Sequence, residues 1–306
     1  MIYTVTVNPS TDYIVQLKEL TLGQVNRMAY DTKLPGGKGI NVSRILKELE
    51  QPNTAWGFIG GFTGKFVEGR LQQQNLQTDF TEISADTRIN VKIKAQNETE
   101  INGQGPKVSD AEVAKFKDKF SVLHAGDVVI LSGSLLPNLS SDFYFELIEL
   151  IKAHQAEFVI DTTGESLLKT LKEQPLVVKP NHHELAELFG VKFDGLKDIA
   201  LYGQKLLEKG AKHVLISMAG DGGLLITPTK TYYSPAPKGK VINSVGAGDS
   251  MIGGFVGTYA ATHNSLESFK YGLACGSATA FSEDLADRKK ISEILPQIKI
   301  QEFKLD

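Results

Sequence analysis

Short apolar runs, rich in β-branched residues, recur along the chain and predict buried strands. They lie at 2–7, 54–60, 127–133, 157–161, 176–181 and 213–217. Each run is nearly continuous rather than alternating, which is typical of strands covered on both faces of a parallel sheet. Between most of them the apolar residues recur with a helical period, as at Val42, Ile45, Leu46 and Leu49. This order predicts an α/β fold, with helices on both faces of a mostly parallel sheet.

Two segments, approximately 13–33 and 87–105, interrupt that order with short alternating stretches. In the second, one face would carry Ile89, Val91, Ile93 and Ala95 and the other Asn90, Lys92 and Lys94. Such alternation predicts half-buried antiparallel strands. We therefore expect a small sheet that projects from a single domain spanning residues 1–306. It would act as a lid over a cleft or as the contact of a homodimer.

Polar residues or glycines follow the predicted strands where each one ends. They are Asn8, Asp12, Gly60, Gly61, Ser132, Gly133, Asp161, Asn181 and Ser217. Open α/β sheets bind ligands at the carboxyl ends of their strands. This edge of the sheet is therefore predicted to bind a polar ligand.

Composition indicates which binding partners and which cellular compartment to expect. The net charge of −3 gives no general attraction to nucleic acid or acidic membranes, so an anion must be bound by a local cluster. The only cysteine, Cys275, is predicted to pack in the core, and one cysteine permits no disulfide within the chain. Residues 1–15 do not resemble a signal peptide, and no apolar run reaches the about 18 residues of a membrane span. We expect a cytoplasmic protein without nucleic-acid or membrane partners.

The stretch NSVGAGDS (243–250) has the features of an anion site. Its small residues leave the backbone amides of Gly246, Ala247 and Gly248 uncovered, and a helix is predicted to start near Asp249. Free N–H groups and the positive end of the helix dipole attract anions. The alternative is that Asp249 serves only as the N-cap of that helix.

A carboxylate beside uncovered amides suits phosphoryl transfer. The amides would neutralise the phosphoryl oxygens, while Asp249, kept ionised by the helix dipole, would accept the proton of the attacking hydroxyl. Gly253, Gly254 and Gly257 continue into the predicted helix, although each costs about 1 kcal/mol relative to alanine. Something must therefore pack closely against this helix, and a bound nucleotide is one candidate.

A second glycine cluster, LPGGKGINVSR, contains Gly36, Gly37, Lys38 and Gly39. A helix is expected to begin near Asn41, so the cluster is either part of the ligand site or a loop capped by Asn41 with Lys38 in solvent. It is not a Walker loop. The nearest candidate, IGGFTGKF, has Ile59 in place of the first glycine and Phe66 after the lysine. ATP, if used, would not be bound in the P-loop manner.

The stretch KPNHHEL (179–185) permits two interpretations. Asn181 followed by Glu184 is a capping-box pattern, although the same groups could order magnesium and its waters. His182 and His183 are adjacent on a helix, do not face one another and lack a third ligand, so no metal role is expected for them.

Two further features leave alternatives open. SMAGDGG, from Ser217, is predicted to be a hairpin turn between two apolar runs. Arg27, Lys38 and Arg88 lie in or beside the interrupting segments and the glycine cluster. They are either solvated surface residues or a shared anion site.

The chain resembles the ribokinase/PfkB family of sugar kinases over essentially its whole length, because six motifs occur in that family's order. They are NPSTD, GGKGINVSR, GFIGG, LSGSLLP, KPNHHE and VGAGDS. The resemblance implies a ribokinase-like, Rossmann-like fold and phosphoryl transfer from ATP with Mg²⁺. TRINVKIK resembles members that act on phosphosugars, which implies fructose 1-phosphate as acceptor at its 6-hydroxyl and fructose 1,6-bisphosphate as product. Tagatose 6-phosphate is the alternative acceptor, and a non-catalytic sugar-phosphate sensor is a further alternative.

The resemblance also implies roles for individual residues. Asp249 would be the catalytic base, and the amides of Gly246, Ala247 and Gly248 the anion hole. The implied substrate-binding residues are Asp12, Arg27, Gly37, Lys38, Asn41, Arg88 and Asn90, with the phosphate bound by Arg27, Lys38 and Arg88. The implied nucleotide-binding residues are Lys179, Asn181, Ser217, Gly220, Gly222, Ser244 and Gly248, while Asn181 and Glu184 would serve magnesium through water. Many members have Asp-Thr before the hole, where this chain has Asn243 and Ser244, which leaves open the role of that position in cation binding.

Overall fold

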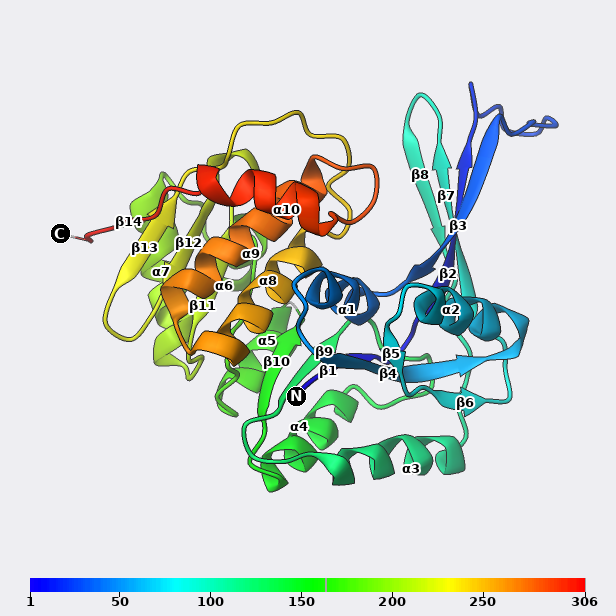
Figure 1. The fold of residues 1–306 in the computed structure, drawn as a ribbon, viewed down its shortest axis with the longest axis horizontal. Helices are drawn as coiled ribbons and strands as arrows, with labels where there is room; N and C mark the ends of the chain where they lie inside the picture. Colours follow the sequence, from blue (N-terminus) through cyan, green and yellow to red (C-terminus); the bar gives the residue numbers. More distant parts are fainter. Residues whose placement is uncertain (163, 306) are drawn as a thin grey trace.

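The first half of the chain builds a parallel sheet. The computed structural model describes residues 1–162 and 164–305. Strands β10 (Glu157–Asp161), β9 (Val128–Ser132), β1 (Ile2–Thr6) and β4 (Asn53–Gly60) lie side by side in that order and are parallel (Figure 1). Two short strands, β5 (Gln77–Thr78) and β6 (Thr81–Ile83), pair with β4. The continuous apolar runs at these positions are buried, as the sequence predicts.

The second half adds an antiparallel sheet. Its strands are β11 (Val214–Ser217), β12 (Gly223–Ile226), β13 (Thr231–Ser234) and β14 (Gln301–Glu302). The prediction of a strand at 176–181 is wrong, because this segment forms only isolated bridges to β11 and one bond to β10, from Leu176 N to Phe158 O at 2.8 Å. Pro180 has no N–H to donate, which interrupts a ladder at this point. The segment nevertheless joins the two sheets edge to edge.

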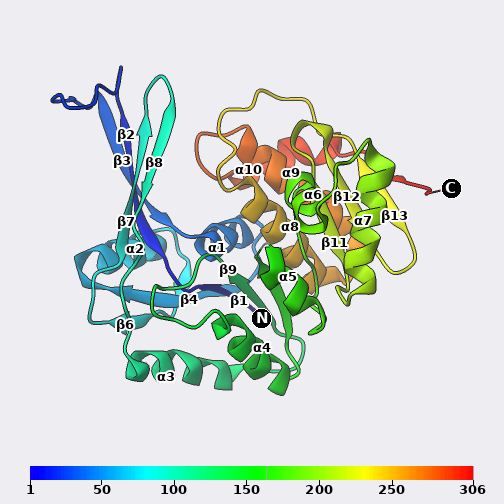
Figure 2. The same cartoon turned by 180° about the vertical axis from the view of Figure 1, so that it is seen from behind.

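Helices cover both faces of the sheets, as expected. They are α1 (Lys38–Glu48), α2 (Gly61–Gln73), α3 (Asp110–Asp118), α4 (Phe143–Ala153), α5 (Gly164–Leu171), α6 (His182–Phe189), α7 (Leu196–Glu208), α8 (Ala247–Thr262), α9 (Ser265–Ala280) and α10 (Arg288–Ile294). One apolar core lies between the sheet and α1, α8, α9 and α10, and another lies between the sheet and α3 and α4 on the opposite face (Figure 2). A third core packs α5, α6 and α7 against β11 and β12. Cys275 is buried in the first core, as predicted.

The glycines of α8 make room for neighbouring helices rather than for a nucleotide. A Cβ on Gly254 would lie 2.5 Å from the carbonyl oxygen of Tyr271 on α9. A Cβ on Gly253 would lie 3.0 Å from Ile45, and one on Gly257 would lie 2.8 Å from Leu46, both on α1. The expectation of close packing is confirmed, but the nucleotide candidate is wrong at these positions. Close contact between three helices explains the tolerance of glycine here.

The two interrupting segments form a small sheet that projects from the main body (Figure 1). Its strands lie in the order β3 (Tyr30–Gly36), β2 (Ser10–Gln16), β7 (Arg88–Lys94) and β8 (Glu98–Asn102). We call it the projecting sheet. It is mixed rather than antiparallel, because β2 and β7 leave the main body in the same direction and pair in parallel. This sheet was expected from sequence, although its strands begin earlier, at Ser10, and extend to Gly36.

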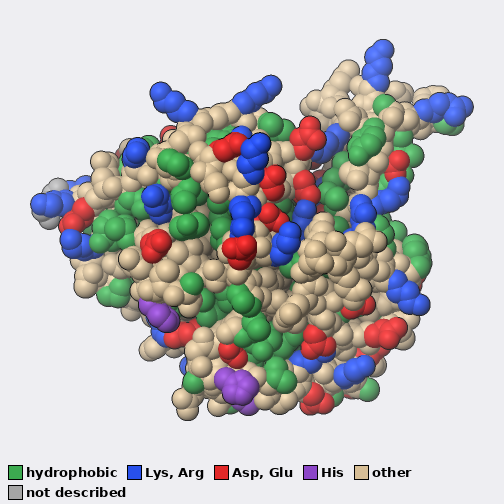
Figure 3. Space-filling model, in the orientation of Figure 1, with side chains coloured by type: hydrophobic (Ala, Val, Ile, Leu, Met, Phe, Trp, Pro, Cys, Tyr) green, Lys and Arg blue, Asp and Glu red, His purple; other side chains and the backbone are tan. Residues whose placement is uncertain are grey.

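The projecting sheet and the loop between its strands β2 and β3 expose several large apolar side chains. They are Leu22, Val25, Met28, Tyr30, Ile89 and Ile101, with exposed fractions from 42% to 87%. Hydrophobic groups are visible over this part of the molecule in Figure 3. The alternation in β7 therefore places polar residues towards the main body and Ile89 outwards. Among the described residues, no helix has the length and apolar character to cross a membrane.

Candidate active site

A cavity of about 450 Å³ lies between the projecting sheet and the carboxyl edge of the parallel sheet. Pairing registers place Thr6, Ser132 and Asp161 side by side at that edge, where β1, β9 and β10 end. The lining residues are Thr6, Asn8, Ser10, Asp12, Gly37, Lys38, Asn41, Arg88, Asn90, Lys92, Glu100, Asn102, Gly133, Ser134, Val245, Gly246, Gly248 and Asp249. Most of the predicted substrate-binding residues therefore share one cavity with the predicted base.

Asp249 lies in the first turn of α8 and is 8% exposed. The helix begins at Ala247, and its N-cap is Gly246, which has a left-handed backbone with φ of 79°. The helix thus starts two residues before Asp249, close to the predicted position, and the alternative that Asp249 is the N-cap is wrong. A glycine N-cap supplies no side-chain acceptor, so the first-turn amides stay available to a ligand.

The anion hole differs in one respect from the expectation. The N–H of Ala247 donates to the carbonyl oxygen of Ser244 at 3.2 Å, so it is already engaged. The first helical bond at this end runs from Ser250 N to Gly246 O, at 2.8 Å. The N–H groups of Gly248 and Asp249 precede that bond and have no acceptor within the helix. The positive end of the helix dipole adds to their attraction for an anion.

The carboxyl group of Asp249 is held by Asn41, whose Nδ2 donates to Oδ2 at 2.8 Å. Burial, together with the negative charge of Asp161, raises the pKa of Asp249 to about 6. Asn41, Lys38 and Lys179 act in the opposite direction but do not compensate. Desolvation is therefore the larger effect on this pKa, although a carboxyl group with a pKa of about 6 is still mostly ionised at neutral pH, as expected from the sequence. A carboxyl group with such a pKa is a stronger base once ionised.

Lys38 is the first residue of α1, and its Nζ lies 2.7 Å from Asp161 Oδ2. Burial alone would lower the pKa of Lys38, but the charges of Asp161, Asp249 and Glu184 raise it overall. The helix was expected to begin near Asn41, with Lys38 in solvent as one alternative. The helix begins three residues earlier than expected, because the N–H of Asn41 already bonds to Gly37 O at 2.9 Å, inside the helix. The Lys38 side chain remains about half exposed, but its ammonium is paired with Asp161.

The projecting sheet contributes Asp12 and Arg88. Asp12 Oδ1 accepts hydrogen bonds from Ser10 Oγ at 2.6 Å and from Asn90 Nδ2 at 3.0 Å. Arg88 donates from Nη1 to Gly103 O at 2.8 Å and from Nη2 to the backbone oxygen of Asn8 at 3.0 Å. Its Nε is buried and has no partner among the described residues. These groups form a polar wall opposite Asp249.

Some site residues differ from the sequence-based set. Arg27 is exposed in the loop between β2 and β3 and is not among the lining residues, so the described chain does not bring it to the cavity. Lys92, Glu100 and Asn102 do line the cavity, although none was predicted as a site residue. Lys92 follows Arg88 and Asn90 at a spacing of two residues, so a strand would place all three on one face. This spacing is the sequence signal that could have identified Lys92.

Of the predicted nucleotide-binding residues, Asn181 and Ser217 lie beyond Asp161 along the same edge, whereas Gly248 lines the cavity itself. Asn181 bridges to Ser217 at the end of β11, and the hairpin expected there is confirmed by the antiparallel pairing of β11 and β12. Gly220 and Gly222 form that turn, with η2 (Ala219–Asp221) inside it. A Cβ on Gly248 would lie 3.0 Å from Lys179 Nζ, so Lys179 reaches the first turn of α8.

The capping-box interpretation of Asn181 and Glu184 is confirmed. Glu184 N donates to Asn181 Oδ1 and Asn181 N donates to Glu184 Oε2, both at 2.8 Å. Within residues 1–162 and 164–305, no cluster of three or more His, Cys, Asp or Glu side chains is arranged to bind a metal ion. The expectation that His182 and His183 do not face one another is wrong, because their ring centroids lie 3.8 Å apart, with the rings tilted by 39°. Asn243 donates from Nδ2 to Glu283 O at 3.0 Å and thereby anchors the loop that carries Ser244.

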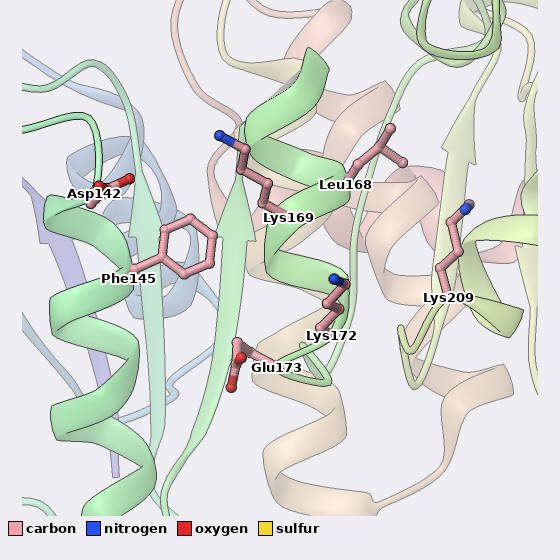
Figure 4. Close-up of a pocket in the computed structure, with 7 residues that line it drawn as sticks. All are labelled: Asp142, Phe145, Leu168, Lys169, Lys172, Glu173 and Lys209. Atoms are coloured by element: carbon pink, nitrogen blue, oxygen red, sulfur yellow. The ribbon is translucent and has the colours of Figure 1, made fainter.

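A larger hollow of about 760 Å³ lies elsewhere, between α4, α5 and the end of α7 (Figure 4). Its lining residues are Asp142, Phe145, Leu168, Lys169, Lys172, Glu173 and Lys209. None of these residues is at the carboxyl edge of the sheet or was predicted in the site. The smaller cavity, which contains Asp249, is therefore the candidate active site.

Comparison with known proteins is consistent with this geometry. The chain is 49% identical to 1-phosphofructokinase of Bacillus subtilis, over 98% of this chain and 99% of that protein. It is 38% identical to D-tagatose-1-phosphate kinase of Bacillus licheniformis, over 98% of this chain and 99% of that protein. Phosphofructokinase-2 from Escherichia coli, solved in complex with substrates and products, superposes with a TM-score of 0.91 at 27% identity, covering 96% of this chain and 98% of that chain. Because the model of the pfkB family of carbohydrate kinases matches residues 6–290, the chain belongs to that family.

Proposed function

We propose that this protein transfers the terminal phosphoryl group of ATP to the 6-hydroxyl of fructose 1-phosphate, which gives fructose 1,6-bisphosphate and ADP. The observation that carries the proposal is a buried Asp249 next to free first-turn amides, facing a cavity with cations on its opposite wall. The identity of 49% to 1-phosphofructokinase of Bacillus subtilis supports this choice of sugar.

Asp249 is proposed as the base. In its ionised form it accepts the proton of the 6-hydroxyl as the new O–P bond forms, and Asn41 keeps its carboxyl group oriented. Of the three amides predicted for the anion hole, those of Gly246, Ala247 and Gly248, the amide of Gly248 is best placed to bind the transferring phosphoryl group, because the N–H of Ala247 is engaged by Ser244. The N–H of Asp249, which also has no acceptor within the helix, would bind the same group.

The sugar is proposed to lie between Asp249 and the projecting sheet. Asp12, Gly37, Asn41 and Asn90 would contact its hydroxyls. Arg88 would bind the 1-phosphate, because its buried Nε still lacks a partner in the described chain. Lys38, held by Asp161, lies near Asp249 and suits the phosphate being transferred.

ATP is proposed to lie along the edge beyond Asp161. Its binding residues would be Lys179, Asn181, Ser217, Gly220, Gly222 and Ser244. Glu184 retains one carboxylate oxygen, Oε1, outside its capping bond. This donor set fits a magnesium ion that is bound mainly by phosphates and water, with Asn181 and Glu184 in its outer shell. Mg²⁺ there would neutralise charge on the β- and γ-phosphates.

We further propose that the whole chain, 1–306, acts as one kinase domain with the projecting sheet as its lid. Closure of the sheet over the sugar would exclude water and limit ATP hydrolysis. The exposed apolar side chains of the loop between β2 and β3, together with Ile89 and Ile101 on the face away from the cavity, suit a second copy of the chain. The substrates and the single buried thiol suit the cytoplasm.

A phosphorylation screen tests the proposal. ADP release is measured with fructose 1-phosphate, fructose 6-phosphate, tagatose 1-phosphate, tagatose 6-phosphate and the free sugars. The highest kcat/KM is expected for fructose 1-phosphate. A higher value for a tagatose phosphate would instead favour the activity named for the Bacillus licheniformis relative or its 6-phosphate counterpart. Binding of phosphosugar with no ADP release from any acceptor would indicate a sensor.

A further inference from the structure

Lys92 belongs to the face of the projecting sheet that lines the cavity. Strands β2 and β7 pair in parallel, with Ser10 beside Arg88 and Asp12 beside Asn90. Side chains alternate along a strand, so Arg88, Asn90 and Lys92 share one face. All three line the cavity. Lys92 is therefore placed to contact whatever the cavity binds.

The ammonium group of Lys92 is held between carboxylates. Its Nζ lies 3.1 Å from Asp12 Oδ2 and 3.9 Å from Glu100 Oε1. The side chains of Lys92 and Asp12 are each only 14% exposed. An ion pair with so little exposure to water interacts more strongly than a surface ion pair. If one partner is removed, the other needs a new group of opposite charge.

The other lining cations have closer partners. Lys38 Nζ lies 2.7 Å from Asp161 Oδ2 on the wall that carries Asp249, a shorter ion pair than that of Lys92. Arg88 donates from both Nη atoms to backbone carbonyl oxygens. Among the described residues, Lys92 pairs only with side-chain carboxylates, and an ammonium has three donors that rotate freely. Of Arg88 and Lys92, the cations that the projecting sheet contributes to the lining, Lys92 can exchange partners more easily.

We propose that Lys92 determines selectivity for phosphosugars by exchanging Asp12 for the phosphate of the acceptor; this rests on the proposed function. A phosphate group carries more negative charge than a carboxylate and attracts the ammonium more strongly. When Lys92 moves to the phosphate, Asp12 Oδ2 becomes free to accept a sugar hydroxyl. Asp12 stays in position, because Ser10 and Asn90 still donate to its Oδ1.

The exchange couples two recognition events. A free sugar has no phosphate group to attract Lys92. Its hydroxyl groups must therefore compete with the Lys92 ammonium for Asp12. A phosphosugar supplies the replacement partner and gains the hydroxyl contact as well. Removal of the Lys92 charge should therefore weaken phosphosugar binding without weakening the binding of the free sugar.

Calorimetric titration tests this coupling in the intact protein. Fructose 1-phosphate and fructose are titrated separately into the wild type, Lys92→Met, Lys92→Arg and Lys94→Met. Lys94 is on the same strand and outside the cavity lining, so it is a control matched in charge. We expect Lys92→Met to raise the Kd of fructose 1-phosphate by about 10- to 100-fold and to leave or lower the Kd of fructose. Lys92→Arg should recover most of the loss, and Lys94→Met should change either Kd by less than about twofold.

The results separate this inference from the proposed function. Equal weakening of fructose 1-phosphate and fructose in Lys92→Met would overturn it, because Lys92 would then only order Asp12. An unchanged Kd for fructose 1-phosphate would overturn it as well. A wild type that binds fructose 1-phosphate without releasing ADP contradicts the proposed function alone, since the binding ratios still decide the role of Lys92. A wild type that does not bind fructose 1-phosphate contradicts both.

Discussion

At the scale of single residues, the chemistry depends on a carboxyl group in an unfavourable environment. Asp249 is buried, lies near the negative charge of Asp161, and has a pKa raised to about 6. Because a base must be ionised to accept a proton, activity should depend on this pKa. The opposing effects of Asn41 and Lys38 keep the group ionised in most molecules at neutral pH.

The pH dependence of kcat/KM should follow the ionisation of Asp249. We expect it to fall as pH decreases through about 6 and to be level above that value. Removal of the Asp161 charge in Asp161→Asn should lower the Asp249 pKa, so the fall should move to lower pH. Glu149→Gln, an equal charge change on the exposed side of α4, should not move it. If the pH profile of kcat/KM for Asp161→Asn coincides with that of the wild type, a group other than Asp249 determines the pH dependence.

At the scale of elements, the position of Asp249 depends on how closely α8 packs against its neighbours. The contact of α8 with α9 passes over Gly254, where an added Cβ would lie 2.5 Å from Tyr271 O. Backbone atoms cannot rotate away as side chains do, so the helices themselves would have to separate. The first turn of α8 carries the candidate base, and the site therefore depends on this contact.

Gly254→Ala should consequently destabilise the protein. We expect a loss of about 1–3 kcal/mol in the free energy of unfolding, measured with urea, because the substitution overpacks the contact between the helices. Gly69→Ala in α2 is the matched control, since a Cβ there meets nothing within 4 Å. Alanine at that position should stabilise the protein by about 0.5–1 kcal/mol. Equal effects at both sites would mean that helix propensity, and not packing, explains the glycines.

Some elements could be predicted from sequence and others could not, for identifiable reasons. Continuous apolar runs revealed the buried strands, and alternation revealed β7, because burial imposes those periods directly. The run at 176–181 was misjudged because apolar character does not show whether a ladder is complete, and Pro180 interrupts it. The spacing of the α8 glycines indicated a close neighbour without identifying it as a helix.

The site could be predicted only in part for the same reason. The motifs identified Asp249, Asn41 and Asp12 because each lies close in sequence to the glycines or to the strand end that form the ligand edge. The raised pKa of Asp249 depends on burial by several elements that are distant in sequence. The alternation of β7 groups Lys92 with Arg88 and Asn90, but only the assembled fold shows that this face of the strand points into the cavity.

At the scale of the whole molecule, the projecting sheet has two different faces. Its polar face closes one side of the cavity, whereas its outer region exposes residues such as Leu22, Val25 and Ile101. Apolar side chains gathered on a projecting element favour association, since burial of their surface is worth about 25 cal/mol per Å². Catalysis and assembly would then share one structural element.

Association through the projecting sheet can be tested by light scattering. The wild type should be a dimer at micromolar concentration, and Ile101→Asp should shift it towards monomer because a charge would be buried at the contact. Leu201→Asp, which changes an exposed apolar residue on α7, should leave the dimer intact. A monomeric wild type, or equal dissociation by both variants, would contradict the proposed contact.

The most direct measurement is ADP release by Asp249→Asn with ATP, Mg²⁺ and fructose 1-phosphate. The amide can still accept the hydrogen bond from Asn41 but cannot accept a proton, so kcat should fall by about 10²- to 10⁴-fold. The variant should remain folded and, above pH 6, be at least as stable as the wild type in urea, because the cost of burying an ionised carboxylate is gone. A folded Asp249→Asn protein with turnover equal to the wild type would contradict the account.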